Sequence, residues 1–322
     1  MKIVYDNHNI QTWMYPVFIT LLGTTLSCTS PRSQFESGRV TPYGSTVAGG
    51  QMVVNVGSAP AAKIADAIAI PADDLNLLFD RNDTLSAEEA ARLKTQVAQL
   101  GEGVVAYACD PSGVGVVWYA RYGFAPRFDA GYKYISGSHT IDGRYQFLGP
   151  TATGKKGTPT NSGNRWFGSI GLQLTTQGIG SPSWLKVFSD QISFDFRRTD
   201  IIVPLTMSYS FGRDEEYGGI ALGMCYSQAN LKYQTQSDIV LQALNEQGIA
   251  ERIEVRDIQG KSVARGMGGY ITLKLGYKRV FLTPSLNVFY HDFGDFQNML
   301  GDDFHLSGWS IIPSMGLRFV IR

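Results

Sequence analysis

Apolar and polar residues alternate with a period of two along much of the chain beyond residue 110. The clearest segment runs from Trp309 to Arg322, where every second residue is apolar. That face carries Trp309, Ile311, Pro313, Met315, Leu317, Phe319 and Ile321, and the residues between them are mostly small or charged. Alternation of this kind predicts a β-strand with one apolar face.

The same pattern predicts ten strands, most of them near the roughly 9–11 residues that a tilted membrane strand needs. They span residues 46–57, 114–123, 127–135, 139–148, 165–175, 192–211, 217–228, 266–278, 280–290 and 309–321. The alternative is twelve strands, if residues 191–197 pair separately or residues 103–109 form a strand. Pro204, Pro284 and Pro313 cannot donate to a strand ladder, so we interpret them as bulges or local pairing gaps.

Aromatic residues gather at the two ends of the predicted strands. One end carries Tyr122, Phe124, Tyr145, Phe147, Tyr209, Phe211, Tyr277 and Phe319, and the other carries Tyr226, Tyr290 and Trp309. Two such belts are typical of transmembrane β-barrels, in which they lie at the membrane interfaces. We therefore predict an all-β fold, an antiparallel transmembrane up-and-down β-barrel. A water-soluble β-sandwich is the alternative.

The links between predicted strands differ in length at the two ends. They are short at 123–127, 212–217 and 277–280, and long at 228–264 and 291–308, with the link 149–164 as a long exception on the short side. In outer-membrane barrels the short turns are periplasmic and the long loops are extracellular. We therefore expect the last strand to end on the periplasmic side.

The last strand resembles the β-signal by which barrel proteins are recognised for assembly in the outer membrane. Ser314 is the polar residue, Gly316 follows two positions later, and Phe319 and Ile321 are apolar at alternate positions. The chain ends in Arg322, where the common bacterial form ends in an aromatic residue. As a whole the chain resembles small bacterial outer-membrane β-barrel proteins in general. The resemblance implies location in the bacterial outer membrane, with membrane lipid and the barrel assembly machinery as partners.

Residues 1–27 are typical of an export signal. The mostly apolar run Trp13 to Leu26 is too short to span a membrane as a helix, but it has the length of a signal core. The residues before Cys28 resemble a lipoprotein processing site, so this cysteine is either lipidated or an incidental residue after an ordinary cleaved signal. A start at Met14 is a further alternative. The mature barrel then comprises residues 28–322.

Residues 58–112, between the first two predicted strands, interrupt the alternation and predict a helical insert. Residues 59–70 are rich in alanine, and residues 86–89 form a capping box that opens a helix to residue 100. Residues 80–89 also resemble a shortened EF-hand loop, so calcium is the alternative to a capped helix turn. We expect the insert at the extracellular end or folded into the barrel mouth. A second short helix is predicted over residues 238–247.

The charge balance of the chain restricts its partners. The 322 residues include 28 basic and 28 acidic side chains, with a formal net charge of zero, so no basic face suggests nucleic acid as a partner. Charged residues make up 17% of the chain, below the roughly 25% of soluble domains. Beyond the N-terminus no apolar run is long enough for a membrane-spanning helix. The composition fits a sheet protein with an apolar outer surface.

Residues that could carry chemistry are few. Of the four histidines, two lie near carboxylates in one link, and the group comprises His291, Asp292, Asp302, Asp303 and His305. We interpret this group as a solvated acidic surface loop, since no nucleophile with a base and an orienting group is evident. Cys109 and Cys225 either form a disulfide or remain free thiols. The sequence therefore predicts no catalytic residue, no metal site and no cofactor.

Strand alternation directs seven charged residues toward the barrel interior. They are Arg121, Asp129, Lys133, Asp142, Arg144, Lys274 and Arg318. Their mixed signs predict salt bridges, and side chains largely fill a barrel of about this size. We therefore expect a structural or interaction component of the cell envelope with a largely filled lumen, which contacts an envelope protein through the insert and residues 228–264. A narrow, porin-like channel for ions or small solutes is the alternative, and a lipid-modifying enzyme is a further one.

Overall fold

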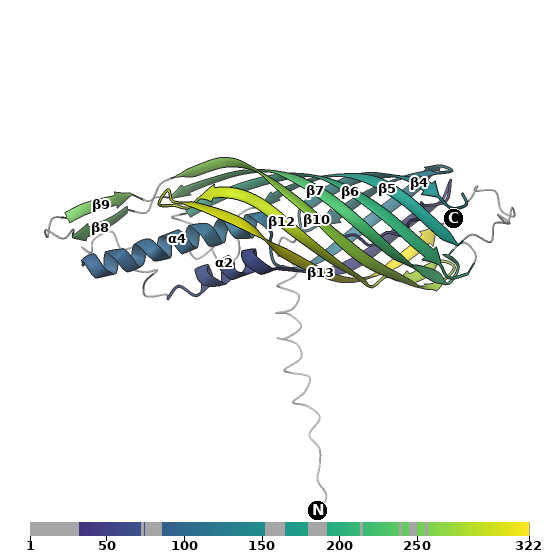
Figure 1. Ribbon diagram of the computed structural model, residues 1–322, viewed down its shortest axis with the longest axis horizontal. Helices are drawn as coiled ribbons and strands as arrows, with labels where there is room; N and C mark the ends of the chain where they lie inside the picture. The colour runs from purple at the N-terminus through teal and green to yellow at the C-terminus, as the bar shows by residue number, and fades with distance from the viewer. Residues whose placement is uncertain are drawn as a thin grey trace, which may run out of the picture.

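The computed structural model describes residues 32–71, 74, 86–151, 165–179, 192–212, 215–237, 240–244, 250–254 and 257–321. One antiparallel sheet closes on itself, because β1 pairs with β2 on one side and with β13 on the other. The strands of this sheet are β1 (Thr46–Gly57), β2 (Gly113–Ala125), β3 (Phe128–Ile135), β4 (Ser138–Leu148), β5 (Trp166–Ile179), β6 (Ile192–Ser210), β7 (Gly218–Ser237), β10 (Ile258–Tyr277), β11 (Val280–Leu282), β12 (Ser285–Gln297) and β13 (Asp303–Ile321) (Figure 1).

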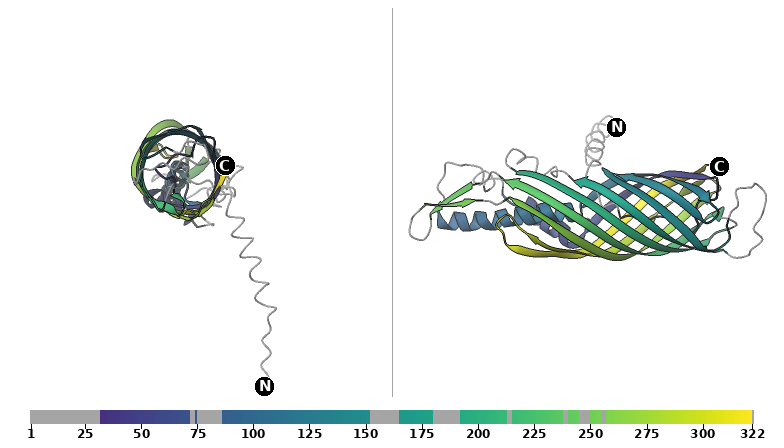
Figure 2. Two further views of the ribbon diagram at one scale, coloured as in Figure 1. Left: turned by 90° about the vertical axis from the view of Figure 1, so that its right-hand side faces the viewer. Right: turned by 90° about the horizontal axis from the view of Figure 1, so that it is seen from above.

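The closed sheet confirms the predicted barrel and excludes the β-sandwich. Within the described residues, β11 and β12 both pair with β10 and β13 and share one position in an 11-stranded sheet, which leaves the ten positions predicted. The twelve-strand alternative is wrong, since residues 192–210 form one strand and residues 103–109 belong to a helix. Seen end-on, the strands form a ring around the barrel axis (Figure 2).

All three prolines lie at the predicted gaps in the pairing. The ladder between β5 and β6 is interrupted near Pro204, and Pro284 separates β11 from β12. Pro313 lies where the ladder between β1 and β13 is interrupted. Each gap falls at a residue without an amide hydrogen, which explains why the pairing is interrupted there, although β6 and β13 continue through their prolines.

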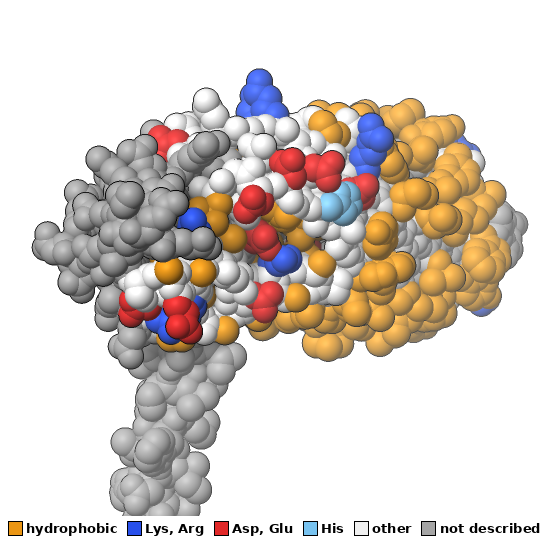
Figure 3. All heavy atoms as spheres, turned by 60° about the vertical axis from the view of Figure 1, so that its left-hand side comes forward, with side chains coloured by type: hydrophobic (Ala, Val, Ile, Leu, Met, Phe, Trp, Pro, Cys, Tyr) orange, Lys and Arg blue, Asp and Glu red, His pale blue; other side chains and the backbone are white. Residues whose placement is uncertain are grey.

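Most of the barrel has an apolar outer face. We call the end where β1 begins and β13 ends the turn end, and the opposite end the helix end. The outer face carries exposed apolar side chains over the turn end and the middle, and they cover that part of the surface (Figure 3). Exposed aromatic residues include Tyr122, Phe124, Tyr145, Phe147, Tyr277 and Phe319 toward the turn end, and Trp118, Tyr226, Tyr290 and Trp309 farther up.

The polarity of the two faces is reversed near the helix end. On β7, Leu231 and Tyr233 point inward and are buried, whereas Lys232 points outward and is exposed. Most residues of 228–264 and 291–308 belong to strands, so the prediction of two long loops there is wrong. The alternation continues through these residues, but with the apolar side chains facing inward, so a search for apolar outer faces ends the strands too early.

In the described part of the link between β1 and β2, the structure has helices α2 (Ser58–Ile68) and α4 (Ala87–Cys109). The predicted capping box is present, since the Ser86 side chain and Glu89 cap the start of α4 reciprocally. The helix continues nine residues beyond the predicted end at residue 100. Among the described residues, neither helix is long and apolar enough to cross a bilayer.

Helix α4 extends into the barrel mouth and explains the reversed polarity. Leu93, Val97 and Leu100 are buried in one apolar cluster with inward-facing residues of the extended strands, among them Phe196 and Leu231. The inner face is apolar here because it packs against a helix, as in the core of a soluble domain.

The prediction of a helix over residues 238–247 is wrong for residues 240–244, which the structure describes. Strand β8 (Val240–Leu244) pairs with β9 (Ala250–Glu254) in a separate antiparallel sheet beyond the barrel. A partner strand across the link supplies the backbone hydrogen bonds, and such pairing overrides a weak local helix preference.

Candidate functional site

The interior of the barrel holds a segment of the chain that precedes the first strand. We call residues 32–41 the luminal segment, in which every residue is buried. Its backbone amides donate to inward-facing side chains of the wall. Gln34 donates to Asn287 (2.8 Å), Gly38 to Ser208 (3.0 Å), Val40 to Gln146 (3.1 Å) and Thr41 to Asp129 (2.7 Å).

Glu36 of the luminal segment lies among three arginines of the wall. Its carboxylate accepts a hydrogen bond of 2.8 Å from Arg318 on β13. Arg144 on β4 lies 3.5 Å from Glu36, and Arg121 on β2 lies 3.7 Å from it. Sequence reasoning missed Glu36, because residues before the first strand carry no alternation. The excess of inward-facing arginine over nearby carboxylates was the one available signal.

The other partners of these arginines are carboxylates predicted to share the interior. Arg144 binds Asp129 in a bidentate manner, with Nε to Oδ1 at 3.0 Å and Nη2 to Oδ2 at 2.6 Å. Arg121 donates to Asp142 at 2.8 Å. Gly131, opposite Arg121, leaves room for this arginine, since a Cβ there would lie 2.9 Å from its Cγ. The result is a buried network of alternating charge, in which each removal takes a partner from at least one buried charge.

The two predicted lysines lie in different surroundings. Nζ of Lys133 lies 4.9 Å from the ring centroid of Phe35, a cation–π contact with the luminal segment. Lys274 donates to Glu215 at 2.7 Å near the turn end. Glu215 belongs to the turn between β6 and β7. Burial raises the pKa of its carboxyl, but the charges of Lys274, Arg39 and Arg318 and the hydrogen bond from Lys274 together outweigh burial and lower the pKa below the ordinary value.

A second buried cluster lies where α4 ends inside the mouth. The Cys109 carbonyl accepts hydrogen bonds from Arg198 at 2.8 Å and from Arg32 at 3.2 Å. Asp110 accepts from Asn55 at 2.8 Å and from Ser310 at 2.5 Å. These donors satisfy carbonyl and carboxylate groups at the helix C-terminus, where the helix dipole favours cations.

The predicted assembly-signal residues lie on the strand that closes the barrel. Phe319 and Ile321 point outward, with exposed fractions of 43% and 57%. Ser314 points inward and bonds Gln51 at 2.8 Å and Ser285 at 2.5 Å. Gly316 lies against the backbone of Gln51 on β1, where a side chain would not fit. The face assignment of this strand is as predicted.

The predicted acidic group around His291 does not form one loop. His291 is buried inside the barrel between the rings of Phe289 and Phe293, because strand β12 includes it and turns it inward. His305 points outward and bonds Asp295 at 2.8 Å. The part of the chain that the structure describes contains no group of three His, Cys, Asp or Glu residues that could hold a metal ion.

The remaining sequence predictions concern the cysteines, the N-terminal signal and the EF-hand-like stretch. Cys109 and Cys225 are both free and buried, so the disulfide alternative is wrong. Burial raises the pKa of the Cys109 thiol, which disfavours the reactive thiolate. The signal at 1–27, Cys28 and most of the EF-hand-like stretch 80–89 lie outside the described residues.

Comparison with solved structures returns membrane proteins at low similarity. Neisserial surface protein A aligns at 10% identity and a TM-score of 0.29, covering 85% of this chain and 96% of that one. Ail, the attachment invasion locus protein of Yersinia pestis, aligns at 12% identity and a TM-score of 0.26, covering 85% and 97%. A major outer membrane protein from Thermus thermophilus aligns at 11% identity and a TM-score of 0.25, covering 64% and 98%. No protein-family model matches the chain, and no curated protein sequence matches it either.

At these scores the class of the protein rests on its own geometry. A closed antiparallel barrel leaves no unpaired sheet edge, and here it presents an apolar band bordered by aromatic side chains. That combination is the architecture of bacterial outer-membrane barrels. The chain is therefore an outer-membrane β-barrel protein, with membrane lipid around its apolar band. Within that class it has ten strand positions and a mouth that holds a helix.

Proposed function

We propose that the protein is a non-catalytic structural and interaction component of the outer membrane whose lumen is closed by its own chain. The observation that carries the proposal is the luminal segment, held to the wall by Glu36 and its three arginines. Two spaces beside this segment measure only about 10 and 30 Å³. Such volumes hold about one water molecule, which supports a lumen without a solute path.

The part beyond the barrel supports an interaction role. The first turns of α4, with the exposed residues Glu88 and Lys94, extend out of the mouth beside the β8–β9 hairpin (Figure 1). Of the three two-residue turns between described strands, 126–127 and 278–279 lie at the opposite end and 136–137 does not, a distribution that supports a periplasmic turn end and an extracellular helix end. An envelope protein would then meet the insert and the β8–β9 region at the cell surface. The barrel assembly machinery would recognise β13 during insertion.

Conductance in planar lipid bilayers tests the closed lumen. We expect the wild-type protein to give no stable channel, and Glu36→Arg to open one, because a fourth cation among the three arginines expels the luminal segment. Glu88→Arg, the same change on an exposed helix position, is the control and remains silent. Heat-modifiable migration on a gel verifies that each variant is folded. A stable open conductance of the wild-type protein would mean that the lumen is a hydrated channel.

Labelling of intact cells tests the orientation. A cysteine at Lys94 is expected to react with a membrane-impermeant maleimide, whereas a cysteine at Lys278, in a turn at the other end, is not. The native Cys109 and Cys225 are buried and serve as internal background. Reaction of the Lys278 site alone would place the insert in the periplasm.

A further inference from the structure

Three basic side chains form a row across the outer face of the barrel near the helix end. Arg197 on β6 is paired with Lys232 on β7, and Lys232 is paired with Lys261 on β10. All three side chains point outward and are exposed. We call them the basic row. The ladder between three adjacent strands holds their cations at neighbouring positions on a rigid wall.

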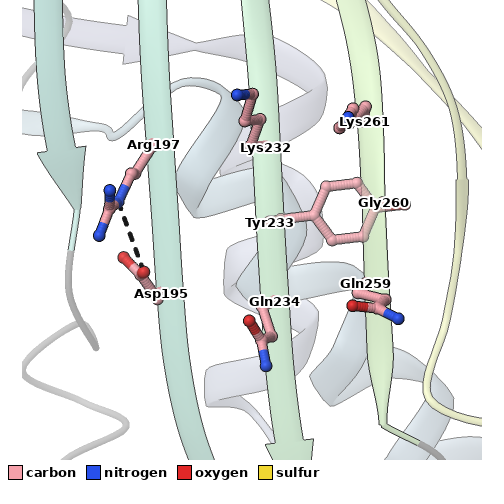
Figure 4. Close-up of a pocket in the computed structure, with 8 residues that line it drawn as sticks. All are labelled: Asp195, Arg197, Lys232, Tyr233, Gln234, Gln259, Gly260 and Lys261. Carbon is pink, nitrogen blue, oxygen red and sulfur yellow. Dashed lines mark ion pairs between the residues drawn. The ribbon is translucent and has the colours of Figure 1, made fainter.

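Among the side chains that the structure describes, one carboxylate pairs with the basic row. Nε of Arg197 lies 3.6 Å from the carboxylate of Asp195 (Figure 4). Within the described parts of the chain, neither Lys232 nor Lys261 has an ion-pair partner. Like charges directly opposite one another on neighbouring strands repel. An anion lying across the row would relieve this repulsion and accept charge-assisted hydrogen bonds from several strands at once.

The basic row borders a shallow hollow of about 350 Å³, a volume in the range of small-ligand sites. Tyr233 on β7 and Gly260 on β10 also line the hollow, and the Tyr233 ring, buried on the inner side of the wall, spans toward Gly260 (Figure 4). A side chain at position 260 would collide with this ring, so glycine keeps the position clear. The amides of Gln234 and Gln259 lie beside the cations and offer donors and acceptors to hydroxyl groups.

The height of the basic row above the membrane selects the kind of ligand. Lys232 and Lys261 lie six residues beyond Tyr226 and Met267, whose exposed side chains belong to the apolar band. Six residues span about 20 Å along a strand, or about 15 Å along the membrane normal at a tilt of about 40°. This is the level of a bulky polar headgroup and lies beyond the acyl chains.

The strand that pairs with β10 on its other side, β12, carries acidic side chains on the same rim. Asp292 and Asp295 on β12 expose 58% and 83% of their side chains, around His305 on β13. The basic row on β6, β7 and β10 is therefore bordered by acidic side chains on the β12 side. A ligand that binds there is anionic, and it approaches from one side of the barrel.

We infer that the basic row binds the phosphate groups of a saccharide headgroup carried by a glycolipid of the outer leaflet. The inference rests on the proposed orientation, with the helix end outside the cell. The two lysines and Arg197 hold the phosphates, and the glutamine amides bond sugar hydroxyls. Acyl chains of the same lipid lie against the apolar band below, so one molecule contacts both surfaces.

Titration of the refolded full-length protein with a phosphorylated glycolipid in mixed micelles tests this site. We expect the wild-type protein to bind it at least about tenfold more tightly than the dephosphorylated form, because charge-assisted hydrogen bonds are lost with the phosphates. Lys232→Gln combined with Lys261→Gln should lose a similar factor and weaken the dependence of affinity on salt. Lys94→Gln combined with Lys278→Gln removes the same charge elsewhere and should bind like the wild-type protein.

Equal affinity of the two double variants would overturn the site, and so would equal affinity for both forms of the lipid. A soluble polyphosphate that binds as tightly as the glycolipid would mean a soluble anion site, which also overturns the inference. If the wild-type protein does not bind the glycolipid and also gives no channel in planar bilayers, the basic-row inference fails and the closed lumen still holds. Conductance by a barrel that binds the glycolipid contradicts the closed lumen alone, so the two proposals fail separately.

Discussion

Nη1 of Arg318 donates a hydrogen bond of 2.8 Å to Oε2 of Glu36, and thereby ties the last strand of the barrel to a segment that precedes the first. The two residues are 282 positions apart in the chain. Strand β13 closes the barrel by pairing with β1, so this contact joins the luminal segment to the seam of the barrel. Folding of the luminal segment and closure of the sheet are therefore coupled.

Glu36→Gln is expected to destabilise the barrel. The variant leaves three buried arginines with one carboxylate fewer, and removal of one member of a buried ionic group costs about 3–5 kcal/mol. Thermal unfolding in detergent, followed by heat-modifiable gel migration, measures the change. Glu88→Gln, on the exposed start of α4, should leave the melting temperature unchanged. Equal melting of both variants would show that the Glu36 contacts contribute no stability.

Replacement of Arg144 by lysine is expected to preserve only part of the barrel's thermal stability. Arg144→Ala removes both hydrogen bonds that the arginine donates to Asp129, and leaves this buried carboxylate with the Thr41 amide and with Arg121 at 3.6 Å. Arg144→Lys keeps the charge but cannot form the bidentate pair. We expect melting temperatures in the order wild type, lysine variant, alanine variant, with ion leakage in the alanine variant. A wild-type protein that already conducts, and an alanine variant altered only in ion selectivity, would contradict the packed interior.

Phe319→Asp is expected to impair membrane insertion far more than Val320→Asp. Phe319 lies on the lipid-facing side of β13, where a charge is costly and where the residue belongs to the motif that resembles a β-signal. Val320 lies on the inner face. The amount of folded protein in isolated outer membranes measures insertion. Equal loss in both variants would contradict the role proposed for this strand in assembly.

Leu93→Ala should loosen α4 from the mouth while the membrane part of the barrel stays folded. Leu93 is fully buried in the apolar cluster, and a leucine-to-alanine change in such a place costs about 2–5 kcal/mol. We expect limited proteolysis to cut α4 faster in this variant, with the heat-modifiable barrel intact. Lys94→Ala, the exposed neighbour, is the control. Unchanged protection of α4 would mean that the packing in the mouth is not what holds the helix.

Acidification should weaken the turn end through Glu215. The Lys274 ammonium lowers the pKa of Glu215 despite its burial, so the carboxylate contributes stability above its ordinary pKa of 4.5 and loses it as the pH falls through the lowered value. Melting temperatures recorded from pH 7 downward should fall in the acid range. Glu215→Gln should start lower at pH 7 and show a smaller acid loss. Parallel pH profiles for the two proteins would contradict this assignment.

The strand pattern could be predicted because it depends on local alternation. From β1 to β13 each membrane-facing segment alternates lipid-facing with interior residues, and this period of two is visible in any short window. The capping box at Ser86 and Glu89 is equally local, since its partners are three residues apart. Such features need no knowledge of distant contacts. They sufficed for the number of strands, their faces and the charged interior.

The remaining features depend on contacts between distant residues. Glu36 has its role only because Arg121, Arg144 and Arg318 meet around it, and no local pattern marks residues 32–41 as part of the interior. The inverted faces of β6, β7 and β10 follow from α4, whose buried side chains supply an apolar surface inside the mouth. The outer row of Arg197, Lys232 and Lys261 likewise depends on register between three strands. Local alternation specifies which residues share a face, but only the closed barrel specifies what that face meets.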